Sequence, residues 1–330
     1  MNRITRIITI ALLGGSLTSV KAQDLHYADV QQMGQWYNPA LRNNPRGEFN
    51  INFRDIRYQN MLSFRTGTAL LSMPIGGSKD TTAASDKGRF NVSLGAAFDQ
   101  TNTGFYKGTA GLLGLSYAQP LSNDGLFAAV GFQASLHTNK YGGSGTFPDQ
   151  FNEYGPIQGA VTNDPLRSGN KYNYMSFHAG ASLYKTGSSL DWYLGGSVRH
   201  LNRPFTENSK LDEFRLNSTM GLQGGFTMHA DRSNFSAYGT GTWKGKASEI
   251  LVGARYEMVL GDKSIDPAQR DKATLLMLGC AVRVKDALIP HVGLQYNRTR
   301  VALHYDMNTS SIQTSGFVRR GFELVLTQNF

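Results

Sequence analysis

The sequence predicts an all-β fold, a transmembrane antiparallel β-barrel of about fourteen strands with a non-barrel extension at the N-terminus. Three observations lead to it: the last strand alternates in polarity, many upstream segments alternate in the same way, and the chain opens with a leader for secretion. No stretch after that leader approaches the roughly 18 unbroken apolar residues that a membrane helix needs. We therefore expect the chain to cross a membrane with strands.

Residues 1–22 have the pattern of a secretory signal peptide. A basic start and a mostly apolar core are followed by the small-residue cleavage pattern Val20-Lys21-Ala22. We expect the mature chain to begin at Gln23. No Cys follows the cleavage site, which argues against a lipid anchor at this end.

Residues 23–48 alternate poorly, and Asn-Pro pairs interrupt them twice, so we expect a periplasmic or lumenal extension rather than a wall strand. This extension either docks a partner on the periplasmic side or turns back into the lumen. Its apolar and aromatic residues argue against a flexible tail. The candidate contacts with a periplasmic partner are Tyr27, Trp36, Tyr37, Asn38 and Pro39.

Residues 49–330 are expected to form the barrel, because a wall strand shows apolar residues to lipid and small or polar residues to the lumen at every second position. In the segment 250–260, for example, Arg255 and Glu257 fall on the lumenal face. The candidate strands lie near 49–58, 61–73, 89–101, 104–118, 125–139, 172–185, 188–201, 213–230, 232–244, 248–261, 272–285, 288–298, 299–308 and 317–330.

The last strand gives the clearest pattern and a candidate barrel-assembly signal. One face carries Phe322, Leu324, Leu326 and Phe330, while the other carries Glu323, Thr327 and Asn329. A terminal strand of this kind, ending on an aromatic residue, is what a transmembrane barrel needs to close its sheet in the outer membrane, in contact with outer-membrane lipids.

The longest connection, 140–171, is rich in Gly and Pro, which are typical of loops. If both termini lie in the periplasm, this loop faces outward, and we expect it to form the main outer surface. By the same count the 74–88 connection is periplasmic, where turns are normally short. This conflict indicates that an early strand is miscounted.

Composition excludes several functions. The formal charge of +9 falls to +6 when the three basic residues of the signal peptide are removed, and the excess is scattered through predicted turns and strand ends. No block of like charges is long enough for a nucleic-acid site. The lone Cys280 excludes an internal disulfide, and no His/Cys cluster has metal spacing, so we expect no metal and no cofactor.

No catalytic motif is found, and the sequence predicts that the protein is not an enzyme. Outer-membrane phospholipases use a Ser that is activated by a His two residues earlier on the same strand face. None of the seven His residues is followed by Ser at that spacing. HExxH and Gly-Lys-Ser loops are also missing from the sequence.

Two stretches resemble the PorP/SprF family of type IX secretion membrane proteins. The first stretch is Gly279 to Phe330, which contains Arg283-Val284-Lys285-Asp286-Ala287-Leu288-Ile289-Pro290, Tyr305-Asp306-Met307-Asn308-Thr309-Ser310 and Gly321-Phe322-Glu323-Leu324. Near the mature N-terminus, Gln23-Asp24 and Asn38-Pro39-Ala40 resemble the opening pattern of the family, with Leu25 at the position of its usual Pro.

The resemblance implies an outer-membrane barrel that works with the type IX secretion and gliding machinery. It further implies export or surface retention of adhesin-like substrates through their C-terminal domains, and contact with a periplasmic peptidoglycan-binding lipoprotein. Our hypothesis is that outer loops hold the substrate domain while the extension at 23–48 meets periplasmic partners. The alternative is a transporter of small hydrophobic molecules similar to the fatty-acid porins, which would need an apolar tunnel.

Overall fold

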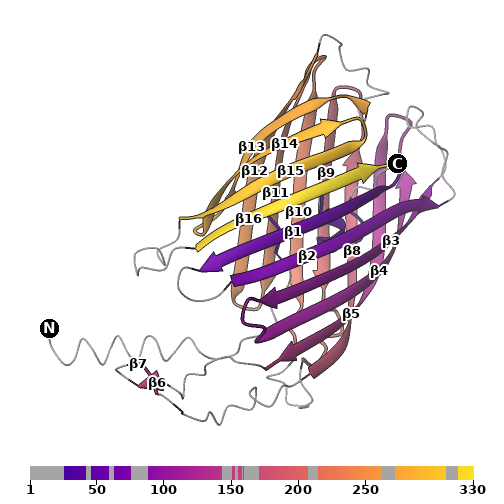
Figure 1. The fold of residues 1–330 in the computed structure, drawn as a ribbon. Coiled ribbons are helices and arrows are strands. Elements are labelled where there is room, and N and C mark those ends of the chain that lie inside the picture. The colour runs from indigo at the N-terminus through magenta and orange to yellow at the C-terminus, as the bar shows by residue number, and fades with distance from the viewer. Residues whose placement is uncertain are drawn as a thin grey trace.

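The computed structural model describes residues 26–41, 46–58, 63–75, 88–142, 151–152, 155–157, 159, 171–206, 215–261, 272–309 and 319–330. The chain folds into a closed barrel of fourteen strands (Figure 1). The strands are β1 (Glu48–Tyr58), β2 (Ser63–Ile75), β3 (Arg89–Thr101), β4 (Tyr106–Pro120), β5 (Leu126–Tyr141), β8 (Lys171–Lys185), β9 (Leu190–Arg199), β10 (Thr219–His229), β11 (Ser233–Lys244), β12 (Ala247–Val259), β13 (Leu275–Arg283), β14 (Ala287–Tyr296), β15 (Thr299–Asn308) and β16 (Arg319–Asn329).

Every wall strand pairs antiparallel with its neighbours in the chain, and β1 pairs with β16 to close the cylinder. In that closing ladder Glu48 stands opposite Asn329 and Phe53 opposite Leu324. Closure removes the exposed edges that an open sheet would leave. The two remaining strands, β6 (Phe151–Asn152) and β7 (Gly155–Pro156), form a separate two-stranded sheet within the predicted loop 140–171.

The barrel has two rims that differ in their connections. The rim where β1 begins and β16 ends is called the C-terminal rim, and the other, which bears the long connection between β5 and β8, is called the loop rim. Several turns are tight: Gly245 at the loop rim and Asn297 at the C-terminal rim both have positive φ, of 60° and 54°. Hairpins with two-residue turns favour Gly and Asn for this reason.

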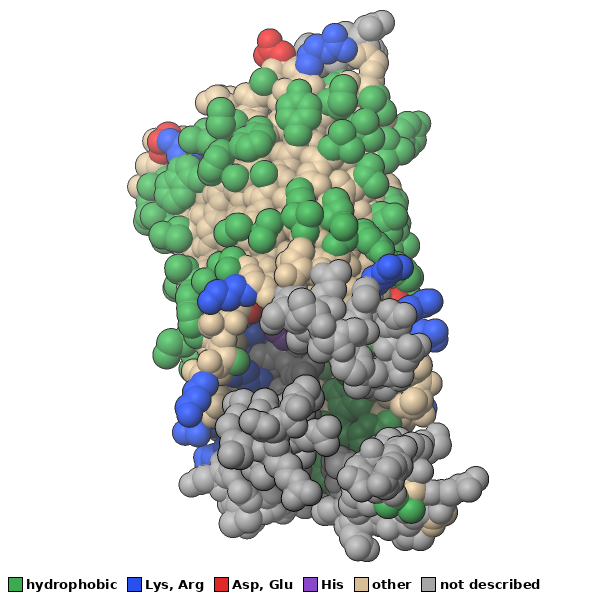
Figure 2. Space-filling view, turned by 90° about the vertical axis from the view of Figure 1, so that its left-hand side faces the viewer, with side chains coloured by type: hydrophobic (Ala, Val, Ile, Leu, Met, Phe, Trp, Pro, Cys, Tyr) green, Lys and Arg blue, Asp and Glu red, His purple; other side chains and the backbone are tan. Residues whose placement is uncertain are grey.

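The outer surface is apolar and the lumen is polar. Outward side chains such as Leu136 and Val130 are 65% and 61% exposed, whereas inward Asn50, Gln133 and Ser176 are almost completely buried. Figure 2 shows apolar side chains spread over the outer wall and charged side chains towards the two ends. This inverted arrangement is the one that a barrel in lipid requires.

Most sequence predictions about the wall are confirmed, with two changes. The strand number is fourteen, so the inference of an early miscount was wrong: the connection between β2 and β3 is long and leaves from the C-terminal rim. The strand expected at 213–230 begins at Thr219, and Arg215 instead forms an isolated bridge with Phe205. The predicted signal peptide and most of loop 140–171 lie outside the described residues.

Before the barrel, the described residues contain one short helix, α2 (Gly34–Tyr37), in the segment 26–41. In the part of the chain that the structure describes, no helix has the length and apolar character to cross a membrane.

Candidate functional site

The segment 26–41, called the plug from here on, lies in the lumen and contacts strands on opposite sides of the barrel. Its side chains are mostly buried, with Tyr27, Met33 and Asn38 completely enclosed. The apolar residues of the predicted extension form a small core inside the barrel. In that core Tyr27 packs edge-on against both Trp36 and Tyr37.

A carboxylate on the last strand holds the first part of the plug. The Glu323 side chain accepts hydrogen bonds from the backbone N–H groups of Ala28 and Asp29, at 2.7 and 3.0 Å. It also accepts one from Asn52 at 2.7 Å and faces Arg54 at 3.5 Å. Because the donors surround a buried charge, these bonds are stronger than neutral ones. The closing seam of the barrel, β1 with β16, is therefore also the seam that anchors the plug.

A network of buried ion pairs extends from this anchor towards the loop rim. Arg54 and Arg283 both contact Asp306, at 3.1 and 3.0 Å, and Arg54 also donates to the carbonyl of His26 at 2.6 Å. Arg319 bridges Asp306 and Asp286 at 3.1 and 2.8 Å. Each charge thus has an oppositely charged neighbour, as buried charges need. The network fixes the start of the plug at one side of the lumen.

The second part of the plug is held by neutral hydrogen bonds, most of them to strands across the lumen from β1 and β16. The Asn38 amide lies 3.2 Å from the Gly196 carbonyl and 3.1 Å from the Gln223 side chain. Gln133 donates to the carbonyl of Gln35 at 2.7 Å, and Gln35 donates to Ser72 at 2.9 Å. The strands β2, β5, β9 and β10 therefore form hydrogen bonds with the backbone and the polar side chains of the plug.

Glycines on four wall strands make room for this part of the plug. A Cβ atom added at Gly131 would lie 2.8 Å from the Pro39 carbonyl carbon and 3.0 Å from the Ala40 nitrogen. Similar atoms at Gly95, Gly180 and Gly195 would collide with Trp36 or Asn38. The lumenal face is thus shaped to the plug, since any larger residue would overlap it.

These contacts locate the five residues proposed from the sequence. The plug brings Tyr27, Trp36, Tyr37, Asn38 and Pro39 together, and all five are buried. Their contact with a periplasmic partner stays a prediction, and it requires the plug to leave the lumen. The residues that hold the plug, such as Glu323 and Gly131, were not proposed as site residues from the sequence.

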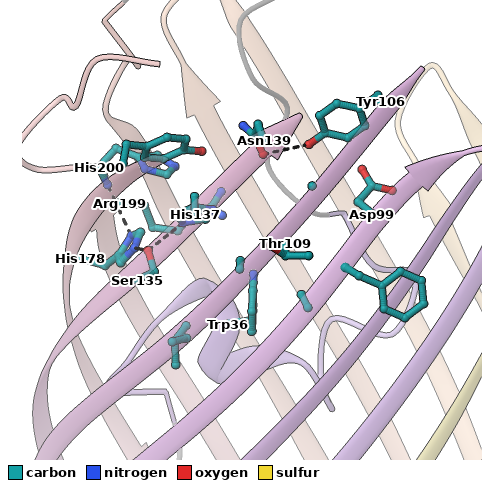
Figure 3. A pocket seen from close by; sticks show the side chains of 16 residues that line it. Trp36, Asp99, Tyr106, Thr109, Ser135, His137, Asn139, His178, Arg199 and His200 are labelled. Carbon is teal, nitrogen blue, oxygen red and sulfur yellow. Dashed lines mark hydrogen bonds between the residues drawn. The ribbon is translucent and has the colours of Figure 1, made fainter. Parts of the chain in front are cut away.

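Beside Trp36, a pocket opens between the plug and the strands β3, β4, β5, β8 and β9 (Figure 3). Its polar lining includes Asp99, Tyr106, Ser135, His137, His178 and His200. Arg199 also lines the pocket, and its guanidinium lies 5.4 Å from the Tyr37 ring centre. Figure 2 shows the loop-rim end of the barrel hollowed, with basic side chains around it.

The three histidines of the pocket are linked by hydrogen bonds, two of them through Ser135 and the third through its own backbone N–H. The Ser135 hydroxyl lies 2.8 Å from His137 Nε2 and 2.7 Å from His178 Nε2, and Ser176 contacts His200 Nδ1 at 2.7 Å. The backbone N–H of His200 donates to His178 Nδ1 at 3.4 Å, which connects the two residues. Within the described residues no group of His, Cys, Asp or Glu is placed to hold a metal ion.

The proposed barrel-assembly residues lie on the outer surface. Phe322, Leu324 and Phe330 are 38%, 44% and 44% exposed, and Leu326 is half-buried on the same face. Glu323 and Thr327 point into the lumen, as the alternation predicted. The placement suits contact with lipid, while the role of these four residues as an assembly signal stays a prediction.

A family model described as "Type IX secretion system membrane protein PorP/SprF" matches residues 19–327. The chain belongs to the PorP/SprF family. This assigns it to the bacterial outer membrane as a component of type IX secretion, a role that is not enzymatic. No curated relative matches the chain by sequence.

Solved structures with the same fold are distant in sequence from this PorP/SprF member. A FadL homologue of Pseudomonas aeruginosa has 11% identity and a TM-score of 0.50, with 86% of this chain and 90% of that chain covered. A TodX mutant, described as a monoaromatic hydrocarbon channel, has 9% identity and a TM-score of 0.51, with 92% and 95% covered. At such identity the similarity extends to the barrel fold and no further.

Proposed function

We propose that this protein is a docking barrel, which retains a secreted adhesin-like substrate at the cell surface by holding the substrate's C-terminal domain at the loop rim. The observation that carries the proposal is the plug: the chain fills its own lumen with residues 26–41, anchored on opposite walls. A barrel whose lumen is occupied by its own chain is suited to holding a partner rather than conducting a folded protein through its interior.

The loop rim supports docking in two further ways. The long connection between β5 and β8 leaves from this rim, and long loops on a rigid barrel commonly carry binding functions. The polar pocket beside Trp36 gives donors and acceptors in the same half of the lumen, where a protruding segment of the substrate domain can form hydrogen bonds. The lumenal wall beneath is fixed by the plug and does not need to move.

Docking is tested by shortening the loop. A tagged C-terminal domain of an adhesin-like substrate should co-purify with the wild-type barrel and not with a variant that lacks residues 143–169. The matched control shortens the connection 76–88 at the other rim and should leave capture unchanged. Heat-modifiable migration on a gel shows that each barrel is folded, and equal capture by both deletions would contradict the proposal.

A periplasmic peptidoglycan-binding lipoprotein is the second proposed partner, with Tyr27, Trp36, Tyr37, Asn38 and Pro39 as its contacts. The family membership supports this proposal. Deleting residues 23–48 should abolish pull-down of the lipoprotein while the barrel stays heat-modifiable. An unchanged pull-down would show that these five residues, which are buried in the plug, do not contact the lipoprotein.

Transport of small hydrophobic molecules is the alternative, and the fold shared with a FadL homologue and a hydrocarbon channel favours it. The lumenal side chains argue the other way, because Asn50, Asn52, Asn91 and Gln133 line the interior where an apolar tunnel would run. Uptake of a fluorescent fatty acid by protein-containing liposomes separates the two. Uptake above that of empty liposomes would support transport and weaken the docking proposal.

A further inference from the structure

Three neighbouring strands each carry a lysine in one cross-strand row near the loop rim. Lys107 on β4 stands opposite Lys140 on β5, which in turn stands opposite Lys171 on β8. All three side chains are exposed, and they belong to the outward face of their strands, since the residues next to them, Asn139 and Tyr172, are buried inside. Adjacent strands are about 4.8 Å apart, so this lysine ladder spans about 10 Å.

Like charges directly opposite each other destabilise a sheet, so the ladder calls for a counter-charge. Within the described residues none of its three lysines forms an ion pair. Elsewhere on the same rim, Arg57 stands opposite Arg320, but there Asp55 lies 3.1 Å from Arg57 and supplies the neutralising charge. The lysine ladder therefore lacks an acidic neighbour such as the one that neutralises the Arg57–Arg320 pair.

The position of the ladder favours a lipid as the source of that charge. Along the outward face the next row is Thr109, Thr138 and Asn173, and the row after it holds Leu136 and Met175, where the apolar band begins. Each row is about 7 Å along a tilted strand, so the lysines stand at the level of the headgroups beside the hydrocarbon core. The two exposed acidic residues of the described chain, Asp124 and Asp231, both lie at the other rim.

We propose that the lysine ladder binds the phosphate groups of a phosphorylated glycolipid in the outer leaflet. Three ammonium groups in a row provide several donors to phosphate oxygens, while the acyl chains of the lipid lie against the apolar rows below. The proposal rests on the outer-membrane location and on the outward-facing loop rim predicted from the sequence, and it is independent of which substrate the barrel docks. An acidic protein would have to approach from above the rim, whereas these side chains point sideways into the lipid.

The test compares two triple variants of the full chain, purified in detergent and titrated with diphosphorylated lipid A. The first is Lys107→Gln, Lys140→Gln and Lys171→Gln. The matched control, Lys246→Gln, Lys272→Gln and Lys285→Gln, removes the same charge from exposed lysines outside the ladder. We expect the ladder variant to bind roughly tenfold more weakly or worse, and the control to bind like the wild type. Heat-modifiable migration confirms that both are folded.

Three further arms identify the ligand. Dephosphorylated lipid A should bind the wild type as weakly as the ladder variant does, and replacing the three lysines by Arg should restore binding of the phosphorylated lipid. Displacement of lipid A by millimolar inorganic phosphate would assign the ladder to free phosphate and overturn the proposal. Equal lipid binding by both Gln variants would overturn the proposal too. It would also be overturned if the ladder variant lost capture of the substrate domain but kept its lipid binding, because the ladder would then bind a protein partner.

Discussion

The two walls that face the plug hold it by different chemistry. On the side of β1, β15 and β16, Glu323, Arg54 and Asp306 hold the start of the plug with buried charges. On the side of β3, β5, β8 and β9, glycines such as Gly131 and Gly180 hold its second half by shape, with neutral hydrogen bonds around Asn38. The comparison teaches that one wall fixes where the plug begins, and the other fixes the path it follows.

The charged wall should show the largest effect. Glu323→Ala removes the acceptor for two plug N–H groups and leaves Arg54 with one fewer carboxylate. Breaking a buried charge pair costs about 3 to 5 kcal/mol, so we expect the free energy of unfolding to fall by that amount. Denaturant unfolding in detergent, followed by tryptophan fluorescence, measures the loss.

Glu323→Gln tests whether charge or shape matters at this wall. The amide keeps one acceptor oxygen and the same volume, so a loss much smaller than that of Glu323→Ala would show that hydrogen bonding outweighs the charge. The exposed Asp231→Ala serves as the control and should stay within about 0.5 kcal/mol of the wild type. If Glu323→Ala were as stable as the wild type, the claim that buried charges hold the start of the plug at this wall would be contradicted.

The glycine wall should show an intermediate effect. Gly131→Val places atoms on the backbone of Pro39 and Ala40, which cannot rotate away as a side chain would. Overpacking of this kind costs about 1 to 3 kcal/mol or displaces the plug. Displacement is measured as faster cleavage of the plug by an added protease.

Gly111→Val is the matched control, because Gly111 lies on neighbouring β4 with open space around its Cβ position. It should leave both stability and cleavage unchanged. If Gly131→Val behaves like Gly111→Val, the glycines do not shape the path of the plug.

A single hydroxyl inside the plug should show the smallest effect. Tyr27→Phe removes the 2.7 Å hydrogen bond to Thr68 and keeps the ring contacts with Trp36 and Tyr37. We expect a loss of about 0.5 to 1.5 kcal/mol, with the Thr68 hydroxyl left unpaired at that site. The double variant with Thr68→Val should recover part of this loss, and full additivity of the two changes would argue against the bond.

Strand alternation carried most of the fold prediction. Periodicity acts within one strand, so segments such as 299–308 were found with the bounds that the structure has. The supposed miscount came from a rule about turn length, which the long connection between β2 and β3 does not follow. Polarity likewise placed Arg255 and Glu257 in the lumen, where they pair at 2.9 Å.

The site was harder to predict, because its contacts join residues far apart in sequence. Polarity showed that the segment before the barrel is not wall, but its place in the lumen depends on Glu323, almost 300 residues away in the chain. The sequence analysis tested each histidine only against the residue two positions later in the chain. Strand pairing, in contrast, brings His137, His178 and His200 together. An alignment of inward positions by strand register would have revealed that cluster.

The central claim, that residues 26–41 occupy the lumen, is tested most directly by cross-linking the plug to the wall. In a Cys280→Ser background, cysteines at Ala40 and at Ser182, whose hydroxyl donates to the Ala40 carbonyl at 2.5 Å, should be joined by mild oxidation or a short bis-maleimide in intact cells, as detected by mass spectrometry. Cysteines at Leu303 and Leu324, which stand opposite each other on β15 and β16, are the positive control. Efficient cross-linking of position 40 to position 182 is the predicted result, and cross-linking of the control pair alone would contradict the account.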